Sequence, residues 1–223
     1  MVRVGMARAV DASSRPVGPN FVNRTVWTGD NLDILRGINS ASVDLIYLDP
    51  PFNSNRDYAA PVGSQAAGAA FKDTWTLSDL DTAWAGYIAD EHPAVAYILS
   101  GAGMAHSRGM QSYLTMMAVR LLEMRRVLKP TGSLYLHCNQ YAAHYLKQLL
   151  DAVFGAGNFI TEIVWGYGTP SGGRTAGKKP VKTHDTLLAY ALSYGEHAYN
   201  IQFTPYGDRY LRWFKHTDDD GRA

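Results

Sequence analysis

Hydrophobic and polar positions follow two patterns along the chain, namely short continuous apolar runs and longer segments with apolar residues at helical spacing. The clearest runs, which predict strands, lie at 43–48, 133–138, 159–167 and 186–191. The first of them, VDLIYL, is typical of a parallel strand buried on both faces. Helical spacing is clearest over 109–129, where apolar side chains form one stripe. Strands and helices therefore alternate along much of the chain.

The strand at 43–48 completes a βαβ unit. A β-prone segment at 24–28 precedes a short helix, for which Asp30 or Asn31 can provide the N-cap, and the strand follows that helix. This order of elements predicts an α/β fold with a Rossmann-like sheet.

Other segments lack either period. Residues 1–22 contain arginines, small residues and prolines, and they indicate a mobile leader. Residues 53–71, rich in Gly, Ala, Asn and Ser, predict a functional or mobile loop. Gly101 and Gly103 are expected to break the chain before the long helix.

Charge is distributed unevenly along a chain whose net charge is only +1. Residues 30–110 contain 4 basic and 10 acidic residues, a balance of −6, whereas residues 111–223 contain 13 basic and 9 acidic residues, a balance of +4. Within the basic part, four cations fall in nine residues that include no acid, namely Arg174, Lys178, Lys179 and Lys182. Such a run is either a solvated loop or a loop that contacts nucleic-acid phosphates.

Composition excludes several classes of protein. The 223 residues suit one large domain, or one domain with a small appendage, and the single cysteine rules out an internal disulfide and a four-cysteine zinc site. Too few residues are charged, and too many are aromatic, for a disordered chain. No window resembles a membrane span or the core of a signal peptide, which favours a soluble intracellular protein.

The most informative residues are Asp49, Pro50, Pro51 and Phe52, directly after the apolar run VDLIYL. Ligands of open α/β sheets bind at the carboxyl ends of strands. Two consecutive prolines offer carbonyl acceptors but no N–H donors, beside one carboxylate and one aromatic face. Such a site suits a planar base whose exocyclic amine donates two hydrogen bonds while its ring stacks on the aromatic face. The alternative interpretation is a strand that simply ends at Pro-Pro with a capping aspartate.

Several segments in this order resemble the DNA amino-methyltransferases, and in particular the permuted group in which the catalytic tetrapeptide precedes the glycine-rich cofactor loop. The matching segments are 28–35, 43–58, 71–75, 120–138 and 144–165, with a looser match at 184–191. The tetrapeptide alone is not specific, because some RNA guanine methyltransferases carry it. The combination of segments is specific.

The resemblance implies a role for each candidate residue. Asp49, Pro50, Pro51 and Phe52 correspond to the motif that binds the flipped base and supports methyl transfer. The family places an acidic turn near the cofactor, which assigns cofactor binding to the pair Asp30 and Asn31. The basic loop that contains Arg174, Lys178, Lys179 and Lys182 falls where the family's target-recognition region begins.

The resemblance also implies a domain division and a set of partners. Residues 1–22 would be the leader, 23–166 the base-binding half of the catalytic domain, and 167–223 the start of a target-recognition region with antiparallel strands. The implied reaction moves a methyl group from S-adenosylmethionine, without a metal, to adenine N6 or, as the alternative, cytosine N4 in double-stranded DNA. A restriction subunit or a second copy would be the protein partner, in a prokaryotic cytoplasm and associated with the nucleoid.

The family's glycine-rich cofactor loop has no counterpart in the sequence, because no glycine cluster lies between a strand and an apolar-periodic helix. We therefore expect a circularly permuted and incomplete methyltransferase sheet, whose cofactor loop lies beyond Ala223. Two alternatives are a non-catalytic DNA-binding remnant and one half of a split methyltransferase.

Two further features have simpler interpretations. Cys138 ends a predicted strand without a preceding proline, so we expect a core residue and not the nucleophile of cytosine C5 methylation. For His184 and Asp185 we expect a hydrogen bond at the start of a strand, since no second His or Cys lies at metal-ligand spacing.

Overall fold

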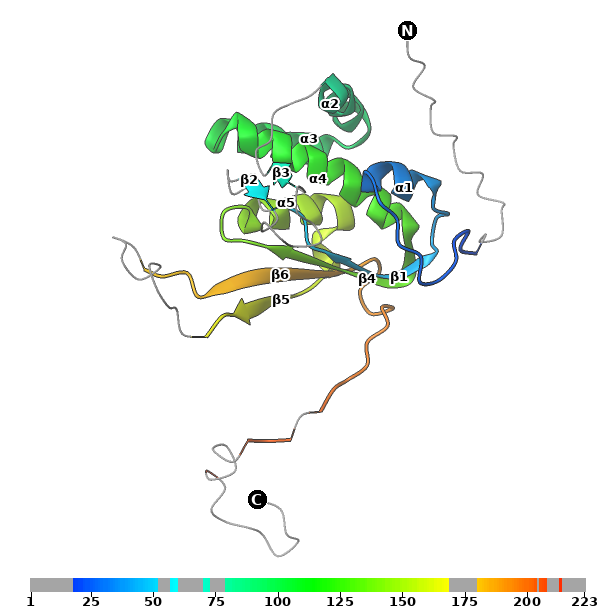
Figure 1. Ribbon diagram of the computed structural model, residues 1–223, viewed down its shortest axis with the longest axis vertical. Coiled ribbons are helices and arrows are strands. Elements are labelled where there is room, and N and C mark those ends of the chain that lie inside the picture. Colours follow the sequence, from blue (N-terminus) through cyan, green and yellow to red (C-terminus); the bar gives the residue numbers. More distant parts are fainter. Residues whose placement is uncertain are drawn as a thin grey trace, which may run out of the picture.

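The protein is described here by a computed structural model, which defines residues 18–51, 57–59, 70–72, 79–168, 180–203, 205–207 and 213. A four-stranded sheet in the order β1-β4-β6-β5 carries the fold (Figure 1). Its strands are β1 (Val43–Leu48), β4 (Leu128–Cys138), β5 (Phe159–Gly166) and β6 (His184–Ala191). A separate antiparallel pair is formed by β2 (Asp57–Ala59) and β3 (Ala70–Lys72). The α/β fold predicted from the sequence is confirmed, but residues 24–28 form no strand, so the βαβ unit predicted to begin there is wrong.

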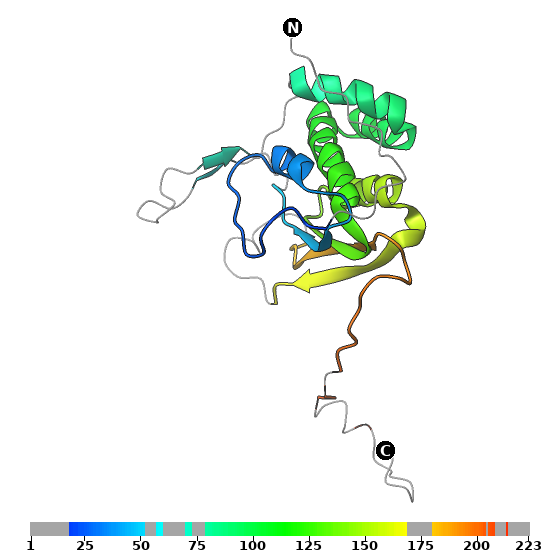
Figure 2. The same ribbon diagram turned by 90° about the vertical axis from the view of Figure 1, so that its right-hand side faces the viewer.

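The helices lie on one face of the sheet (Figures 1 and 2). They are α1 (Asn31–Gly37), α2 (Asp79–Glu91), α3 (Pro93–Ala105), α4 (Arg108–Val127) and α5 (Ala143–Phe154), and a short 3₁₀ helix follows at Ala156–Asn158. None of the helices in the described residues combines the length and the apolar character needed to cross a bilayer.

The long helix α4 occupies the centre of the core. Ser107 begins it by accepting a hydrogen bond from the Met110 N–H at 3.1 Å, as a serine N-cap does. Its apolar stripe is buried together with the facing side chains of the sheet and of α5, among them Tyr113, Met117, Leu121, Leu134, Leu136, Leu146 and Leu150. The helix predicted over 109–129 is thus confirmed, except that it ends two residues earlier, where β4 begins.

Strand directions bring the carboxyl ends of β1, β4 and β5 and the amino end of β6 to the same side of the sheet. β1 and β4 are parallel, with Leu48 opposite Leu136, whereas β6 runs antiparallel to β4, with Leu187 opposite His137. The carboxyl ends of β1 and β4 therefore lie beside the amino end of β6. This edge is where α/β sheets bind their ligands.

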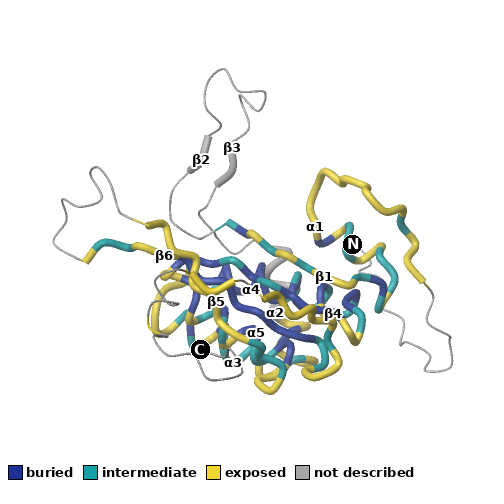
Figure 3. The backbone as a smooth tube through the Cα atoms, turned by 90° about the horizontal axis from the view of Figure 1, so that it is seen from below, coloured by how far each residue is buried: buried dark blue, intermediate teal, exposed yellow. Residues whose placement is uncertain are grey.

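The prediction that β1 is buried on both faces is wrong. β1 is an edge strand of the described sheet, and Leu45 and Tyr47 are exposed on the face that carries no described helix. Only the other side of the strand, with Ile46 and Leu48, packs against the core. Figure 3 shows this face, where exposed and half-buried segments of β1 and β5 flank the buried centre of the sheet.

The predicted break at Gly101 and Gly103 is also wrong, because both residues lie inside α3. Pro93 occupies the first turn of that helix, where its missing N–H has no cost, and buried apolar residues such as Leu99 fix the helix to the core. A Cβ at Gly103 would lie 2.6 Å from Oε1 of Gln111 on α4, so a larger residue here would require the Gln111 side chain to move.

Strand β6 lies within the main sheet, between β4 and β5. The described residues therefore place 184–191 together with the strands of residues 23–166, although the predicted domain division separates them at 166–167. The assignment of the residues after 191 to a target-recognition region stays a prediction.

Candidate active site at the carboxyl edge of the sheet

Asp49 and Pro50 follow β1 directly, on the side of the sheet where the carboxyl ends of β1 and β4 lie beside the amino end of β6. Pro50 is buried and Pro51 is half-buried, so the Pro-Pro step is held against the protein. The Asp49 side chain is 59% exposed and its carboxylate is accessible from outside. Phe52, the fourth residue of the motif, lies outside the described residues.

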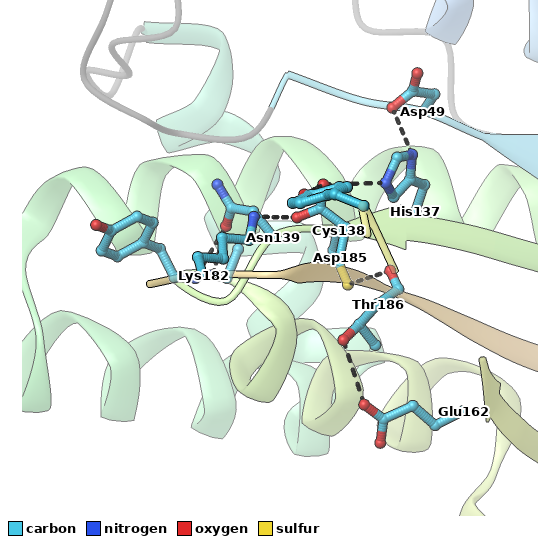
Figure 4. A network of polar contacts seen from close by, with 11 residues as sticks. Asp49, His137, Cys138, Asn139, Glu162, Lys182, Asp185 and Thr186 are labelled. Carbon is cyan, nitrogen blue, oxygen red and sulfur yellow. Dashed lines mark hydrogen bonds and ion pairs between the residues drawn. The ribbon is translucent and has the colours of Figure 1, made fainter. Parts of the chain in front are cut away.

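His137, near the end of β4, lies between two carboxylates (Figure 4). Its Nδ1 is 3.4 Å from Oδ1 of Asp49, and its Nε2 is 3.7 Å from Oδ2 of Asp185. The three residues come from β4, from the start of β6 and from the position directly after β1. The strand order therefore creates this arrangement from segments that are far apart in the sequence.

Asp185 is buried and has two strong donors. The Tyr167 hydroxyl donates to its Oδ2, and the Lys182 ammonium donates to its Oδ1. Burial alone would raise the pKa of Asp185, but the hydrogen bonds from Lys182 and Tyr167 outweigh burial and lower the pKa below its usual value. The carboxylate is consequently ionised at neutral pH.

The pKa values of the two donors, Tyr167 and Lys182, are raised, whereas that of Asp185 is lowered. Burial, together with the hydrogen bond to Asp185, raises the pKa of the Tyr167 hydroxyl. Burial would lower the pKa of Lys182, yet its bonds with Asp185 and Tyr167 raise the pKa. Lys182 thus stays charged within this cluster. The contact of Lys182 with DNA phosphate stays a prediction. In the structure its ammonium is already paired with the Asp185 carboxylate.

Cys138 is a core residue, as expected. Its side chain is fully buried, and its thiol lies 3.5 Å from the Thr186 carbonyl oxygen, to which it donates. Burial, followed by the nearby charges of Asp185 and Glu162, raises the pKa of Cys138 to about 12. A thiol of this kind is not a nucleophile near neutral pH.

The two residues predicted to bind the cofactor have structural partners. Asp30 is the N-cap of α1, accepting from the Leu32 N–H at 2.9 Å, and both of its oxygens accept from Nη2 of Arg120 at 2.7 and 2.9 Å. Arg120 Nε donates to Oδ1 of Asn31 at 2.7 Å. Burial would raise the pKa of Asp30, but the Leu32 hydrogen bond and the Arg120 charge lower it.

These contacts fix Asp30 as an anion at the start of a helix, with half of its side chain exposed. An exposed carboxylate at this position fits a hydroxyl or amine donor of a cofactor, although the guanidinium already occupies much of its hydrogen-bonding capacity. The cofactor contact of Asp30 and Asn31 stays a prediction.

Sequence reasoning missed the contribution of His137 and underestimated Asp185. His137 stands near the carboxyl end of a predicted strand, so the rule that singled out Asp49 could have identified it. Asp185 could not be found in this way, because it stands at the amino end of its strand and reaches the site only through the antiparallel pairing of β6. Arg174, Lys178 and Lys179 lie outside the described residues.

The described part of the site is a cluster of polar and charged side chains. Among the described residues, no three His, Cys, Asp or Glu side chains are grouped so as to hold a metal ion. The site contains the accessible carboxylate of Asp49, the carbonyl groups of the Pro-Pro step, and the imidazole of His137 beside the Asp185–Lys182 ion pair.

Comparison with known proteins gives consistent results. The N6/N4 methyltransferase family model, described as DNA methylase, matches residues 43–217. The StyLTI Mod subunit of a type III restriction-modification enzyme from Salmonella typhimurium is 32% identical over 143 residues, which is 62% of this chain and 19% of that protein. The EcoP15I Mod subunit of Escherichia coli is 27% identical over 142 residues, or 61% of this chain and 20% of that protein.

A type II enzyme is also similar. The methyltransferase M.KpnI of Klebsiella pneumoniae is 25% identical over 172 residues, which is 76% of this chain and 32% of that protein. The chain thus spans about a fifth of the length of the type III relatives and about a third of the type II relative.

Proposed function

Because the chain belongs to the N6/N4 family of DNA methylases, we propose that it forms the base-binding part of a DNA methyltransferase. The reaction would transfer a methyl group from S-adenosylmethionine to the exocyclic amine of a base in double-stranded DNA. Adenine N6 is the proposed acceptor, since the tetrapeptide begins with aspartate. Cytosine N4 is the alternative that the product will distinguish.

The observation that carries this proposal is the position of Asp49. Its accessible carboxylate stands at the carboxyl edge of the sheet, beside a Pro-Pro step that has carbonyl acceptors and no N–H donors. A base amine placed there can donate one hydrogen to Asp49 and the other to the Pro50 carbonyl oxygen. Both N–H bonds are then held, and the nitrogen lone pair is directed away from the ring plane.

This geometry suits attack on an electrophilic methyl carbon. As the new N–C bond forms, positive charge develops on the nitrogen, and the two acceptors stabilise that charge. A strong general base is not required, because the methylated amine is acidic enough to lose its proton after the bond has formed. S-adenosylmethionine, when bound, would supply the methyl group by cleavage of its S–CH₃ bond and leave as the neutral thioether, and the proton lost from the amine would pass to Asp49 or to water.

DNA is the proposed substrate, and the target base must leave the stack to reach the site. An amine inside a duplex cannot be approached in line, so the base is flipped out at a cost of a few kcal/mol. The basic segment with Arg174, Lys178 and Lys179 is proposed to contact phosphates, which would position the duplex without reading its sequence.

The permuted order of the family is also part of the proposal. Asp30 and Asn31 would form one edge of the cofactor site, and a glycine-rich loop outside residues 1–223 would supply the rest. The names of the type III relatives, which are Mod subunits of restriction-modification enzymes, favour association with a restriction subunit. Such an enzyme would act on DNA in the prokaryotic cytoplasm.

Methyl incorporation into DNA tests this function. The full-length gene product would be incubated with duplex DNA and S-adenosylmethionine carrying a tritiated methyl group. We expect incorporation by the wild type and by Asp90→Ala, which removes an exposed carboxylate on α2, but none by Asp49→Ala. Incorporation by Asp49→Ala at the wild-type rate would refute the role of this residue.

A further inference from the structure

The proposed reaction requires one oxygen of Asp49 to stay directed at the base amine. An exposed carboxylate samples several rotamers, however, and the Asp49 side chain is more than half exposed. A displacement of about 1 Å at a reacting group can lower a rate by about 100-fold. The site therefore needs a second side chain that restricts Asp49 without covering it.

His137 is placed to do this. It approaches Asp49 from the adjacent strand, with 3.4 Å between Nδ1 and Oδ1 of Asp49, and leaves Oδ2 of Asp49 for the amine. Exposure falls along the row of side chains, from 59% at Asp49 to 19% at His137 and 11% at Asp185. Asp49 is therefore accessible from solvent, whereas Asp185 lies inside the protein.

Asp185 is held in place by an ion pair and by hydrogen bonds. Asp185 accepts hydrogen bonds from the Tyr167 hydroxyl and the Lys182 ammonium, and its lowered pKa keeps it anionic. Its Oδ2 lies 3.7 Å from Nε2 of His137. An ionised carboxylate only accepts hydrogen bonds, so Asp185 attracts a ring N–H and thereby restricts the orientation of the imidazole.

From this arrangement we propose that His137 positions the carboxylate of Asp49 for methyl transfer, and that Asp185 fixes the orientation of His137. The inference rests on the proposed function, because it gives both residues a part in the chemistry of Asp49. His137 acts through Asp49 and does not contact the base. At 3.4 and 3.7 Å both contacts are longer than ordinary N–H···O hydrogen bonds, so they orient the side chains by polar attraction.

Kinetics of the full-length gene product test the positioning role. In His137→Gln we expect kcat for methyl transfer to fall about 10- to 100-fold while KM for DNA and for S-adenosylmethionine is unchanged. Asp185→Asn should change kcat in the same direction by a smaller factor. The matched control is His144→Gln, on the exposed face of α5, which should leave both constants unchanged.

A double-variant cycle asks whether His137 acts through Asp49. Asp49→Asn alone should leave a small residual single-turnover rate, and adding His137→Gln should not lower this rate further. If His137→Gln reduces the rate by the same factor in both backgrounds, His137 does not work through Asp49. An unchanged kcat in His137→Gln would likewise overturn the proposal.

Two controls separate this inference from other failures. An inactive wild type would refute the proposed function itself, whereas an active wild type with an equally active His137→Gln would refute only the positioning role. Should His137→Gln not fold, the imidazole nitrogen resonances of His137 can be compared between wild type and Asp49→Asn, which alters an exposed side chain. We expect these resonances to shift, and identical resonances would overturn the contact.

Discussion

Replacing Asp185 by asparagine should destabilise the protein in a manner that depends on pH. The substitution keeps the size of the side chain but removes the charge that Lys182 and Tyr167 both bind. A hydrogen bond to a charged group contributes about 1.5–3 kcal/mol. Losing the partner of a buried charge would cost about 3–5 kcal/mol. The Lys182 side chain is 29% exposed, however, and can turn toward water. We therefore expect a loss of about 2 kcal/mol at pH 7.

The sign of the pH dependence follows from the lowered pKa of Asp185. A carboxyl whose pKa is lower in the folded state stabilises the fold above its unfolded value of about 3.9, and this contribution disappears as the pH falls through the folded value. The difference between wild type and Asp185→Asn should therefore be constant from about pH 5 to 8 and shrink below about pH 4.

Urea unfolding at a series of pH values, followed by circular dichroism, measures this difference. Asp90→Asn is the matched control, because its carboxylate is exposed on α2 and its loss should change the free energy of unfolding little at any pH. A difference for Asp185→Asn that stays the same down to pH 3, or that is absent at pH 7, would refute the proposed ion pair.

Three other outcomes are expected. Cys138 is buried and its pKa is raised to about 12, so it should resist iodoacetamide at pH 8 in the folded protein and react only in urea. Mass spectrometry measures the labelling, and rapid labelling of the folded protein would contradict its burial. Arg120→Met should lower the free energy of unfolding by about 1–2 kcal/mol, because it removes the partner of Asp30. Arg125→Met, on the exposed side of α4, is the control and should not lower it, and equal effects of the two substitutions would contradict the pairing. The double substitution Lys178→Ala and Lys179→Ala should weaken DNA binding and flatten its dependence on salt concentration, and an unchanged slope would mean that neither lysine contacts phosphate.

Local patterns were sufficient for most of the elements. The stripe along α4 and the apolar runs of β1 and β4 are encoded within a few residues, and the predictions of these three elements are confirmed. The same rules pointed to Asp49 because the carboxyl end of a strand can be recognised without knowing the neighbouring strand.

Predictions that depend on distant partners did less well. Whether β1 is covered on both faces depends on which elements flank it, and a continuous apolar run does not contain that information. Gly101 and Gly103 were expected to break the chain because of their low helix propensity, but buried residues of the same helix, such as Leu99, hold α3 against the core. Asp185 lies near His137 because β6 pairs antiparallel with β4, although the two residues are 48 positions apart in the sequence. No local sequence pattern predicts this pairing.

The central claim is that Asp49 holds a base amine for methylation. Nucleoside mass spectrometry tests it most directly, after duplex DNA has been incubated with S-adenosylmethionine and the full-length gene product, in wild-type form and as Asp49→Ala. We expect N6-methyladenine with the wild type and none with Asp49→Ala, while N4-methylcytosine would replace the proposed acceptor but keep the site. Methylation at a ring carbon such as cytosine C5, or an undiminished yield from Asp49→Ala, would contradict the account.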